Sequence, residues 1–240
     1  MSSVYLIRHG QAGTRSEYDA LSDLGHQQAY LLGQYLVAQK VQFKAFIAGC
    51  RNRQQQTAQE VWRAYREAGV AVPDIVPEPK WNEFDMTAVF GEFAPRLCES
   101  DPQFKQDYEE LLRRLETEDP DSPIHHAWTE CDTQAMVAWM EDRFPCQTES
   151  WAAFRRRVLS CSAQLAQYQP GDAVAVFTSA APIAIWVADS LSVSDGNLLR
   201  LAGVLLNSAV TTMRLREDGP RLFSFNGVAH LTEPHLRTFR

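Results

Sequence analysis

Short apolar runs alternate along the chain with longer stretches in which apolar residues recur every three or four positions. The first run, Val4 to Ile7, is typical of a buried strand, and it leads directly into Arg8 and His9. Similar runs end at Gly49 and Ser179. Because ligands of open α/β sheets bind at the carboxyl ends of the strands, the residues that follow these runs are candidate site residues.

Two further strand-like runs lie near the end of the chain. They are Val210–Arg216 and Arg221–Phe225, and Asp218-Gly219-Pro220 lies between them. Glycine and proline between two apolar runs favour a tight turn, so this segment predicts a β-hairpin.

The stretches between the strands have helical spacing. Ser22 is a typical N-cap for a helix that extends to Gln39, and a second helix is predicted over Thr57–Glu67. Asp101, followed by proline, and Ser150 start two more helices, the second of which reaches the region of residue 170. Strands that alternate with helices predict an α/β fold of three layers, with helices on both faces of a mixed, mostly parallel sheet.

The middle of the chain has a different character. Residues 84–149 contain no convincing strand and are helical, aromatic and acidic, and prolines at positions 95, 120, 123 and 145 interrupt the helical pattern. We interpret this stretch as a helical insertion, or cap, within a single domain that spans residues 1–240. We expect it to lie over the active site.

Composition narrows the function classes. The 240 residues are 45% hydrophobic and 22% charged, which is ordinary for a globular protein, and the net charge is −7. Because nucleic-acid binders normally carry a basic field, we expect no nucleic-acid partner. No stretch approaches the roughly 18 consecutive apolar residues of a membrane span, and no secretory leader is recognised, so we expect no membrane partner.

The five cysteines are scattered, odd in number and form no CxxC pair. This arrangement favours free thiols over a zinc site or a disulfide framework. We therefore expect a cytoplasmic protein that needs no metal and no cofactor.

Arg8-His9-Gly10 combines three residue types that suit phosphoryl chemistry. A neutral histidine can attack phosphorus when its other nitrogen is held by a hydrogen bond. The planar fork of an arginine binds two oxygens of the transferred group, and glycine lets the backbone approach an anion closely. Alone, a match of three residues is weak, because it arises by chance in many chains.

Further motifs follow in order along most of the chain. They are Arg8-His9-Gly10-Gln11, LSDLGHQQA over Leu21–Ala29, RQQQTA over Arg53–Ala58, Trp81-Asn82-Glu83-Phe84, Glu149-Ser150-Trp151, and Asn226 through His230-Leu231. In this order they resemble the histidine phosphatase superfamily, which includes the cofactor-dependent phosphoglycerate mutases. Residues 84–149 are the part that the resemblance leaves uncovered.

The resemblance implies roles for individual residues. His9 would be the nucleophile that forms a phosphohistidine, Arg8 and Arg53 would hold the phosphoryl oxygens, and Glu83 would protonate the leaving oxygen and later help to activate water. Substrate and phosphate contacts are expected from Gly10, Gln11, Asn82, Thr178, Ser179 and Ala180.

The pattern breaks after the run that ends at Ser179. The family has a second histidine there, in a turn with two glycines, whereas this chain has Ser179, Ala180 and Ala181. In one account, Thr178 and Ser179 together with backbone amides replace the lost donor, and a phosphatase of modest rate remains. In the other, the site binds phosphorylated ligands but turns them over poorly or not at all. We favour the first account. Four other histidines are interpreted as ordinary surface or loop residues: His125, His126, His230 and His235.

The acidic character of residues 84–149 bears on the substrate. A mutase must hold a bisphosphate, which calls for basic residues in the insertion, so a phosphoglycerate mutase is the less favoured alternative. We expect a phosphomonoester hydrolase that acts on a small phosphorylated substrate or a phosphoprotein segment. The sequence leaves the oligomeric state open, a dimer included.

Overall fold

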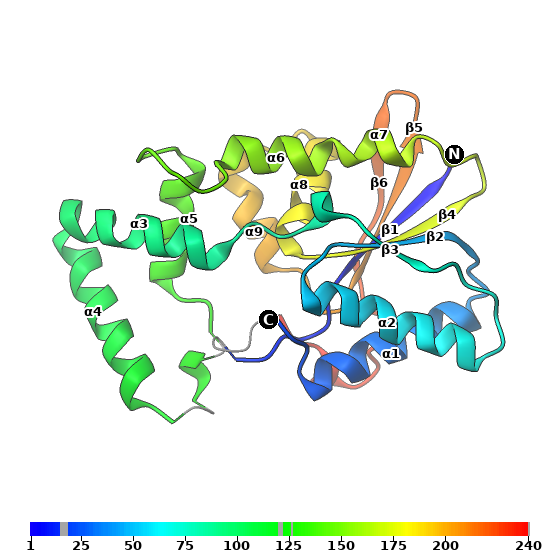
Figure 1. The fold of residues 1–240 in the computed structure, drawn as a ribbon, viewed down its shortest axis with the longest axis horizontal. Coiled ribbons are helices and arrows are strands. Elements are labelled where there is room, and N and C mark those ends of the chain that lie inside the picture. Colours follow the sequence, from blue (N-terminus) through cyan, green and yellow to red (C-terminus); the bar gives the residue numbers. More distant parts are fainter. Residues whose placement is uncertain (15–18, 120–121, 126, 240) are drawn as a thin grey trace. The chain divides into compact units, whose positions relative to one another are not determined.

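The central sheet organises the computed structural model, which describes residues 1–14, 19–119, 122–125 and 127–239. Within these residues one mixed sheet has the strand order β3-β2-β4-β1-β5-β6 (Figure 1). Its strands are β1 (Ser3–Arg8), β2 (Phe43–Ala48), β3 (Ile75–Pro77), β4 (Ala173–Thr178), β5 (Val210–Arg216) and β6 (Gly219–Gly227).

Strand direction brings the predicted site segments together. β1, β4, β2 and β3 are mutually parallel, whereas β5 pairs antiparallel with β1, and β6 pairs antiparallel with β5 at the edge of the sheet. Arg8 at the end of β1 pairs with Thr178 of β4, and Ala48 of β2 pairs with Phe177. The chain segments that follow these strands therefore leave the sheet side by side at the carboxyl ends of the parallel strands, where α/β folds bind ligands.

Helices cover both faces of the sheet. On one face, α1 (Asp23–Ala38) and α2 (Asn52–Glu67) pack on the strands, and the buried cluster there includes Leu32, Val61 and Phe177. The opposite face carries α8 (Ala180–Leu191), whose apolar side chains are almost all buried (Figure 1). The predicted mixed sheet between helices is confirmed.

Tryptophans join α8 to its neighbours. The Trp186 indole N–H donates to the carbonyl of Val158 at 3.2 Å, and its ring packs on Trp81 with ring centroids 5.3 Å apart. Both indoles are fully buried, so these contacts stabilise the sheet face through a large apolar area as well as a hydrogen bond. Trp81 lies in η2 (Pro79–Trp81), directly before the predicted site residues Asn82 and Glu83.

The chain divides into two compact units. One comprises Met1–Glu83 and Arg157–Arg240, and the other comprises Phe84–Arg156. The first unit contains the whole sheet, with α7 (Cys161–Leu165), η4 (Asp195–Asn197), α9 (Leu198–Gly203) and η5 (Pro234–Leu236) in addition to the helices above. The boundary falls within α6 (Trp151–Leu159).

The second unit has helices and no strand among its described residues. Its elements are α3 (Met86–Ser100), α4 (Pro102–Thr117), η3 (Pro123–His125) and α5 (Glu130–Met140). Phe84, Trp139 and Phe154 pack against one another at its centre, with ring centroids 5.0–5.9 Å apart. The predicted position of the insertion over the active site stays a prediction. No helix in the described part of the chain is both long and apolar enough to cross a bilayer.

Several elements differ from the pattern-based expectation. β3 was not predicted, because it is three residues long and Val76 and Pro77 are exposed at the sheet edge. α2 begins at Asn52, not at Thr57, because the polar residues of its first turns are themselves buried. The helix after Ser150 ends at Leu159 and is followed by the separate α7.

One of the prolines expected to interrupt helices in the second unit does not do so. Pro95 lies inside α3, which continues to Ser100, so it does not end the helix. Pro123 begins η3 and Pro145 lies outside the helices. Position 120 lies outside the described residues.

A close contact of two glycines sets the distance between the end of β1 and the start of α1. A Cβ atom on Gly25 would lie 2.1 Å from the carbonyl oxygen of Gln11, and one on Gly10 would lie 2.3 Å from the carbonyl oxygen of Gly25. Both neighbours are backbone atoms and cannot rotate away. Any larger residue at either position must therefore push α1 away from the loop that carries His9.

We predict that Gly25→Ala lowers the free energy of unfolding by about 2 kcal/mol or more, because overpacking against backbone outweighs the helical preference for alanine. Gly203→Ala in α9 is the matched control. No atom lies within 4 Å of the added Cβ there, so a gain of at most about 1 kcal/mol is expected. Urea unfolding of both variants checks this, and an equal effect of the two would contradict it.

Candidate active site

His9 follows the last residue of β1 and is fixed by its own backbone. The backbone N–H of His9 donates to the carbonyl of Thr178 at 2.9 Å, which continues the pairing of β1 with β4. Its carbonyl accepts from the backbone N–H of Ser208 at 3.1 Å and from the Asn207 amide at 3.3 Å. The imidazole therefore projects from a backbone that is held on both sides.

The hydrogen bonds of the His9 ring define its tautomer. Nδ1 lies 2.7 Å from the carbonyl oxygen of Gly10, which can only accept, so Nδ1 carries the proton. Nε2 lies 3.2 Å from Nε of Arg53, which can only donate, so Nε2 presents its lone pair. A neutral imidazole with an unprotonated Nε2 is the form that can attack an electrophile once that nitrogen exchanges its hydrogen bond for the electrophile.

Burial and neighbouring charge keep this ring neutral. The pKa of His9 is lowered well below its usual value by burial first, then by the Arg53 and Arg8 guanidinium groups. The hydrogen bond to Gly10 acts in the opposite direction. His9 is only 1% exposed, so the imidazolium form would be both poorly solvated and repelled.

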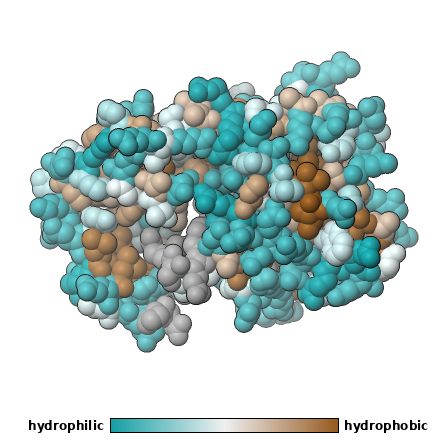
Figure 2. Space-filling model, in the orientation of Figure 1, coloured by the Kyte–Doolittle hydropathy of each residue, from teal (hydrophilic) through white to brown (hydrophobic). Residues whose placement is uncertain are grey.

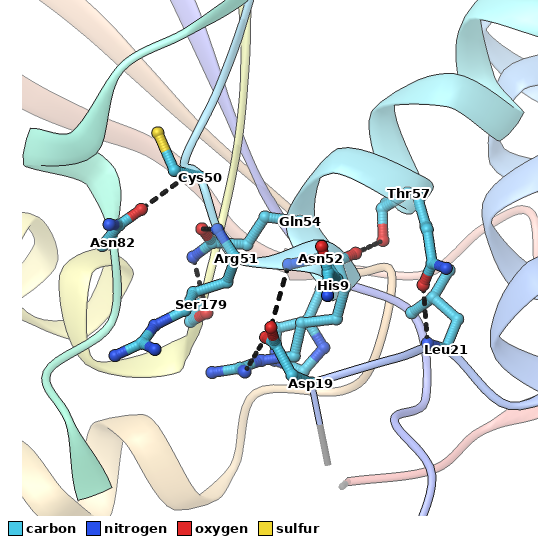
Figure 3. A network of polar contacts seen from close by, with 12 residues as sticks. His9, Asp19, Leu21, Cys50, Arg51, Asn52, Gln54, Thr57, Asn82 and Ser179 are labelled. Atoms are coloured by element: carbon cyan, nitrogen blue, oxygen red, sulfur yellow. Dashed lines mark hydrogen bonds and ion pairs between the residues drawn. The ribbon is translucent and has the colours of Figure 1, made fainter. Parts of the chain in front are cut away.

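Arg53 bridges His9 and a carboxylate. Its Nε–H faces His9, and its Nη1 lies 3.0 Å from Oδ1 of Asp19 (Figure 3). Arg53 lies in the first turn of α2, where its side chain is 6% exposed, whereas that of Asp19 is 48% exposed. The guanidinium is thus a buried part of the site, and the carboxylate of Asp19 is its more exposed partner.

Thr57 fixes the start of α2 against the histidine loop. Its hydroxyl donates to the carbonyl of Arg53 at 2.7 Å and accepts from the backbone N–H of Gly10 at 3.0 Å. One side chain therefore joins the backbones that carry the two key residues of the site. This explains why α2 starts before Thr57 and why its polar first turn is buried.

Arg8 lies beside the site as the last residue of β1. Its side chain is buried, and Nη1 donates to the carbonyl of Leu205. It is close enough for its charge to lower the pKa of His9. The structure thus brings the side chains of His9, Arg8 and Arg53 close to one another, and their roles stay predictions.

Ser179 is tied to Gln54, not to His9. It is the N-cap of α8, it is buried, and its Oγ accepts from Nε2 of Gln54 at 2.8 Å (Figure 3). Oε1 of Gln54 in turn accepts from the backbone N–H of Arg51 at 3.4 Å, and Nε2 also lies 3.3 Å from the carbonyl of Trp81. A buried amide therefore fixes the serine, which retains its own proton for donation.

The Glu83 carboxylate lies at the N-terminus of α8. Its Oε2 accepts from the backbone N–H of Ala181 at 3.2 Å, so the positive end of the helix dipole stabilises it. Its neighbour Asn82 accepts from the backbone N–H of Cys50 at 2.5 Å, which links this loop to the end of β2. The Arg157 guanidinium donates to the Asn82 carbonyl at 3.1 Å.

The remaining predicted contact residues have partners within the protein. The side chain of Gln11 accepts from the Ser22 hydroxyl at 2.8 Å, and the Thr178 hydroxyl donates to the carbonyl of Trp81 at 2.6 Å. Ala180 is the first residue of α8. Their phosphate or substrate contacts stay predictions.

Sequence reasoning missed four residues of this network: Asp19, Gln54, Thr57 and Gln28. Thr57 and Gln54 stand in the RQQQTA motif, so their position was visible although their function was not. Gln28 accepts from the backbone N–H of Gln11 at 2.8 Å and donates to the carbonyl of Leu236 at 2.7 Å. Asp19 belongs to no motif, and no pattern in the sequence marks it.

The other predicted loop histidines lie in different environments. His230 is not a surface residue: it is buried, its Nε2 lies 2.7 Å from the Ser208 hydroxyl, and burial lowers its pKa to about 4. His125 ends η3 in the second unit, and position 126 lies outside the described residues. Within the described part of the chain no cluster of histidine, cysteine and acidic side chains could hold a metal ion.

Comparison with known proteins places this site in a family. The sequence matches the histidine phosphatase superfamily (branch 1) over residues 4–122 and 123–227. No curated protein matches the sequence closely enough to count as a relative. Solved structures with the same fold are numerous.

Three solved structures illustrate the likeness. YhfR of Bacillus stearothermophilus has a TM-score of 0.65 at 18% identity, covering 96% of this chain and 100% of that one. A mycobacterial glucosyl-3-phosphoglycerate phosphatase has 0.60 at 18%, covering 96% and 99%. A phosphoserine phosphatase from Entamoeba histolytica has 0.58 at 18%, covering 96% and 100%. At these identities the likeness shows the shared fold alone.

We predict that the His9 ring is still neutral, with the proton on Nδ1, at pH 6.5, where an exposed histidine is half protonated. Because its pKa is lowered, protonation begins only at more acidic pH than in an exposed histidine. Nitrogen-15 NMR of histidine-labelled protein reports the tautomer, and His9→Asn assigns the signal. A proton on Nε2, or a ring that is half protonated near pH 6.5, would contradict the assignment.

Proposed function

The chain belongs to the histidine phosphatase superfamily, and on that premise we propose that it hydrolyses phosphomonoesters through a phosphohistidine at His9. The observation that carries the proposal is the ring of His9, which has its proton held on Nδ1 and its Nε2 lone pair facing Arg53. A nucleophile and an anion-binding group thus meet at one point.

In the first step of the proposed reaction, Arg8 and Arg53 hold the phosphoryl oxygens of the substrate and stabilise their negative charge. The hydrogen bond from Arg53 Nε–H to His9 Nε2 breaks as the phosphoryl group enters, and the released Nε2 lone pair forms a bond to phosphorus while the bond to the leaving oxygen breaks. Glu83 enters this step protonated and donates its proton to that oxygen, so the alcohol leaves and Glu83 becomes the carboxylate that the N-terminus of α8 stabilises.

In the second step, water attacks the phosphohistidine. Glu83 now takes a proton from the water, the bond between phosphorus and Nε2 breaks, and inorganic phosphate is released. Gly10 keeps the proton on Nδ1 throughout, so the ring returns to the same neutral tautomer. No metal or cofactor takes part in this scheme.

Ser179 takes the place of a charged donor in this proposal. Its hydroxyl accepts from Gln54 and can donate its own proton to a phosphoryl oxygen, and the amides at the start of α8 add further donors. A neutral donor stabilises developing charge less than a cation does. Loss of one such donor typically costs on the order of 10²–10³ in rate, so we expect a slow phosphatase.

An alternative from another class is a protein that binds a phosphorylated ligand without turning it over. The neutral Ser179 is the observation that favours it. A phosphoglycerate mutase is less favoured, because residues 84–149 are rich in acids and a bisphosphate would be repelled. Two of the proteins with a similar fold bear the names of phosphatases, which supports hydrolysis.

The substrate class follows from the same considerations. We propose a small monophosphate or a phosphoprotein segment as the substrate, and a cytosolic location, consistent with five free thiols. Screening purified protein against a panel of phosphorylated metabolites would identify the natural substrate.

We expect the purified protein to hydrolyse p-nitrophenyl phosphate, and His9→Ala to reduce this rate to background because the nucleophile is lost. His26→Ala is the matched control. The His26 side chain on α1 pairs with that of Glu60 on α2 at 2.9 Å. Removal of the His26 imidazole should therefore leave the rate unchanged. Phosphate release measures both variants.

The binding alternative makes a different prediction in the same assay. It expects thermal stabilisation of the wild type by phosphate, no turnover above that of His9→Ala, and no phosphohistidine in acid-quenched protein treated with substrate. That combination would overturn the proposed hydrolysis.

We further expect that Ser179→His combined with Gln54→Ala raises kcat at least tenfold, because it restores a second imidazole and removes the amide that fills its place. Ser179→His alone should gain less, since Gln54 lies 2.8 Å from the serine oxygen. Gln54→Ala alone serves as the control. A folded double variant with an unchanged or lower kcat would show that a missing donor does not limit the rate.

A further inference from the structure

Asp19 contacts the guanidinium that faces the nucleophile. Oδ1 of Asp19 lies 3.0 Å from Nη1 of Arg53, and Oδ2 lies 3.4 Å from the backbone N–H of Asn52 at the start of α2 (Figure 3). The same guanidinium reaches His9 Nε2 through Nε at 3.2 Å. A carboxylate therefore occupies part of the donor set next to the attacking nitrogen.

A phosphate oxygen and a carboxylate oxygen are equivalent acceptors for an arginine fork. An N–H group of Nη1 that donates to Asp19 is not available to a phosphoryl oxygen, and two anions on one guanidinium repel each other. We infer that Asp19 is an internal competitor of phosphate: it pairs with Arg53 in the empty site and must yield when the phosphoryl group binds. This inference rests on the proposed function of Arg53 as a phosphate ligand.

Burial determines which partner moves. The Arg53 side chain is 6% exposed, so the guanidinium has little room to move. The backbone of Arg53 is also held, because its carbonyl accepts a hydrogen bond from the Thr57 hydroxyl. The Asp19 side chain is 48% exposed, so its carboxylate can turn into water at little cost. A doubly charged phosphate that also meets Arg8 therefore displaces it.

The exchange also works in reverse after hydrolysis. Inorganic phosphate leaves the arginines more readily when a carboxylate is ready to take its place on Arg53. Asp19 thus weakens substrate and product alike, and it keeps the buried guanidinium paired between turnovers. The effect bears on affinity, not on bond breaking.

The surface distribution of charge offers a matched control. Asp23 lies in the first turn of α1 and is exposed. The carboxylate that pairs with Arg53 is that of Asp19, not that of Asp23. Asp23→Asn removes the same charge from a nearby element without freeing the guanidinium. Asp19→Asn keeps the shape of the side chain and its ability to accept from Asn52, so the local backbone should stay folded.

The test is calorimetric titration of the full-length variants with inorganic phosphate at pH 8 and low salt. Asp19→Asn should lower the phosphate dissociation constant about three- to tenfold, as expected for the loss of a competing, half-exposed ion pair. Asp23→Asn should change it less than twofold. In turnover assays the same Asp19→Asn variant should lower the phosphate inhibition constant by a similar factor and lower KM more than it changes kcat.

Weaker or unchanged phosphate binding by Asp19→Asn would overturn the inference, since it would mean that Asp19 holds Arg53 in its working position. Equal gains in both variants would also overturn it, because they would reveal a long-range charge effect. If neither the wild type nor Asp19→Asn binds phosphate detectably, the inference is overturned as well. Tighter binding by Asp19→Asn in a protein without turnover would leave the inference standing while the proposed hydrolysis fails.

Discussion

The contact between Arg53 and the lone pair of His9 is the constraint on which the site depends. An imidazole next to a guanidinium keeps its lone pair only if the ring is neutral, and burial together with two arginines ensures this. The carbonyl of Gly10 then holds the proton on Nδ1, so Nε2 is the nitrogen without a proton. The fold supplies these conditions with backbone, because His9 is held at its N–H by Thr178 and at its carbonyl by Ser208. The proposed nucleophile and the proposed anion-binding group are thus held in position by the fold itself.

The first turns of α2 meet this constraint in an unusual way. A helix that packs on a sheet normally buries apolar residues, yet this one begins with a buried arginine, a buried glutamine and a buried threonine. Each has a partner: Arg53 faces His9, Gln54 donates to Ser179, and Thr57 joins Arg53 to Gly10. Buried polar groups of this kind are tolerated only when satisfied, so the helix start is specified by the site more than by packing.

Much of this arrangement could be predicted from sequence, and the limits have physical causes. Runs such as Val4–Ile7 predict strands, and parallel pairing brings their ends together, so the neighbourhood of His9 and Arg53 followed from pattern and motif order. β3 escaped because a three-residue edge strand buries too little to leave a periodic signal. Asp19 escaped because an ion pair with an arginine 34 positions away has no local signature. The bond from Gln54 to Ser179 was hidden for the same reason, since it links residues 125 positions apart.

We propose that Ser179 replaces a charged donor, and this proposal has a consequence for the balance of charge in the site. Near His9 the structure now places two guanidinium groups, those of Arg8 and Arg53, and one of them is shared with the carboxylate of Asp19. An anion entering this site gains less attraction than it would from three cations, and it gains the full attraction of Arg53 only by displacing Asp19. Because binding and transition-state stabilisation draw on the same donors, a site of this composition should lose more in charge stabilisation than in selectivity. What the structure shows is geometry: a neutral imidazole lies against a buried guanidinium, and the proposed slow phosphoryl transfer rests on this arrangement.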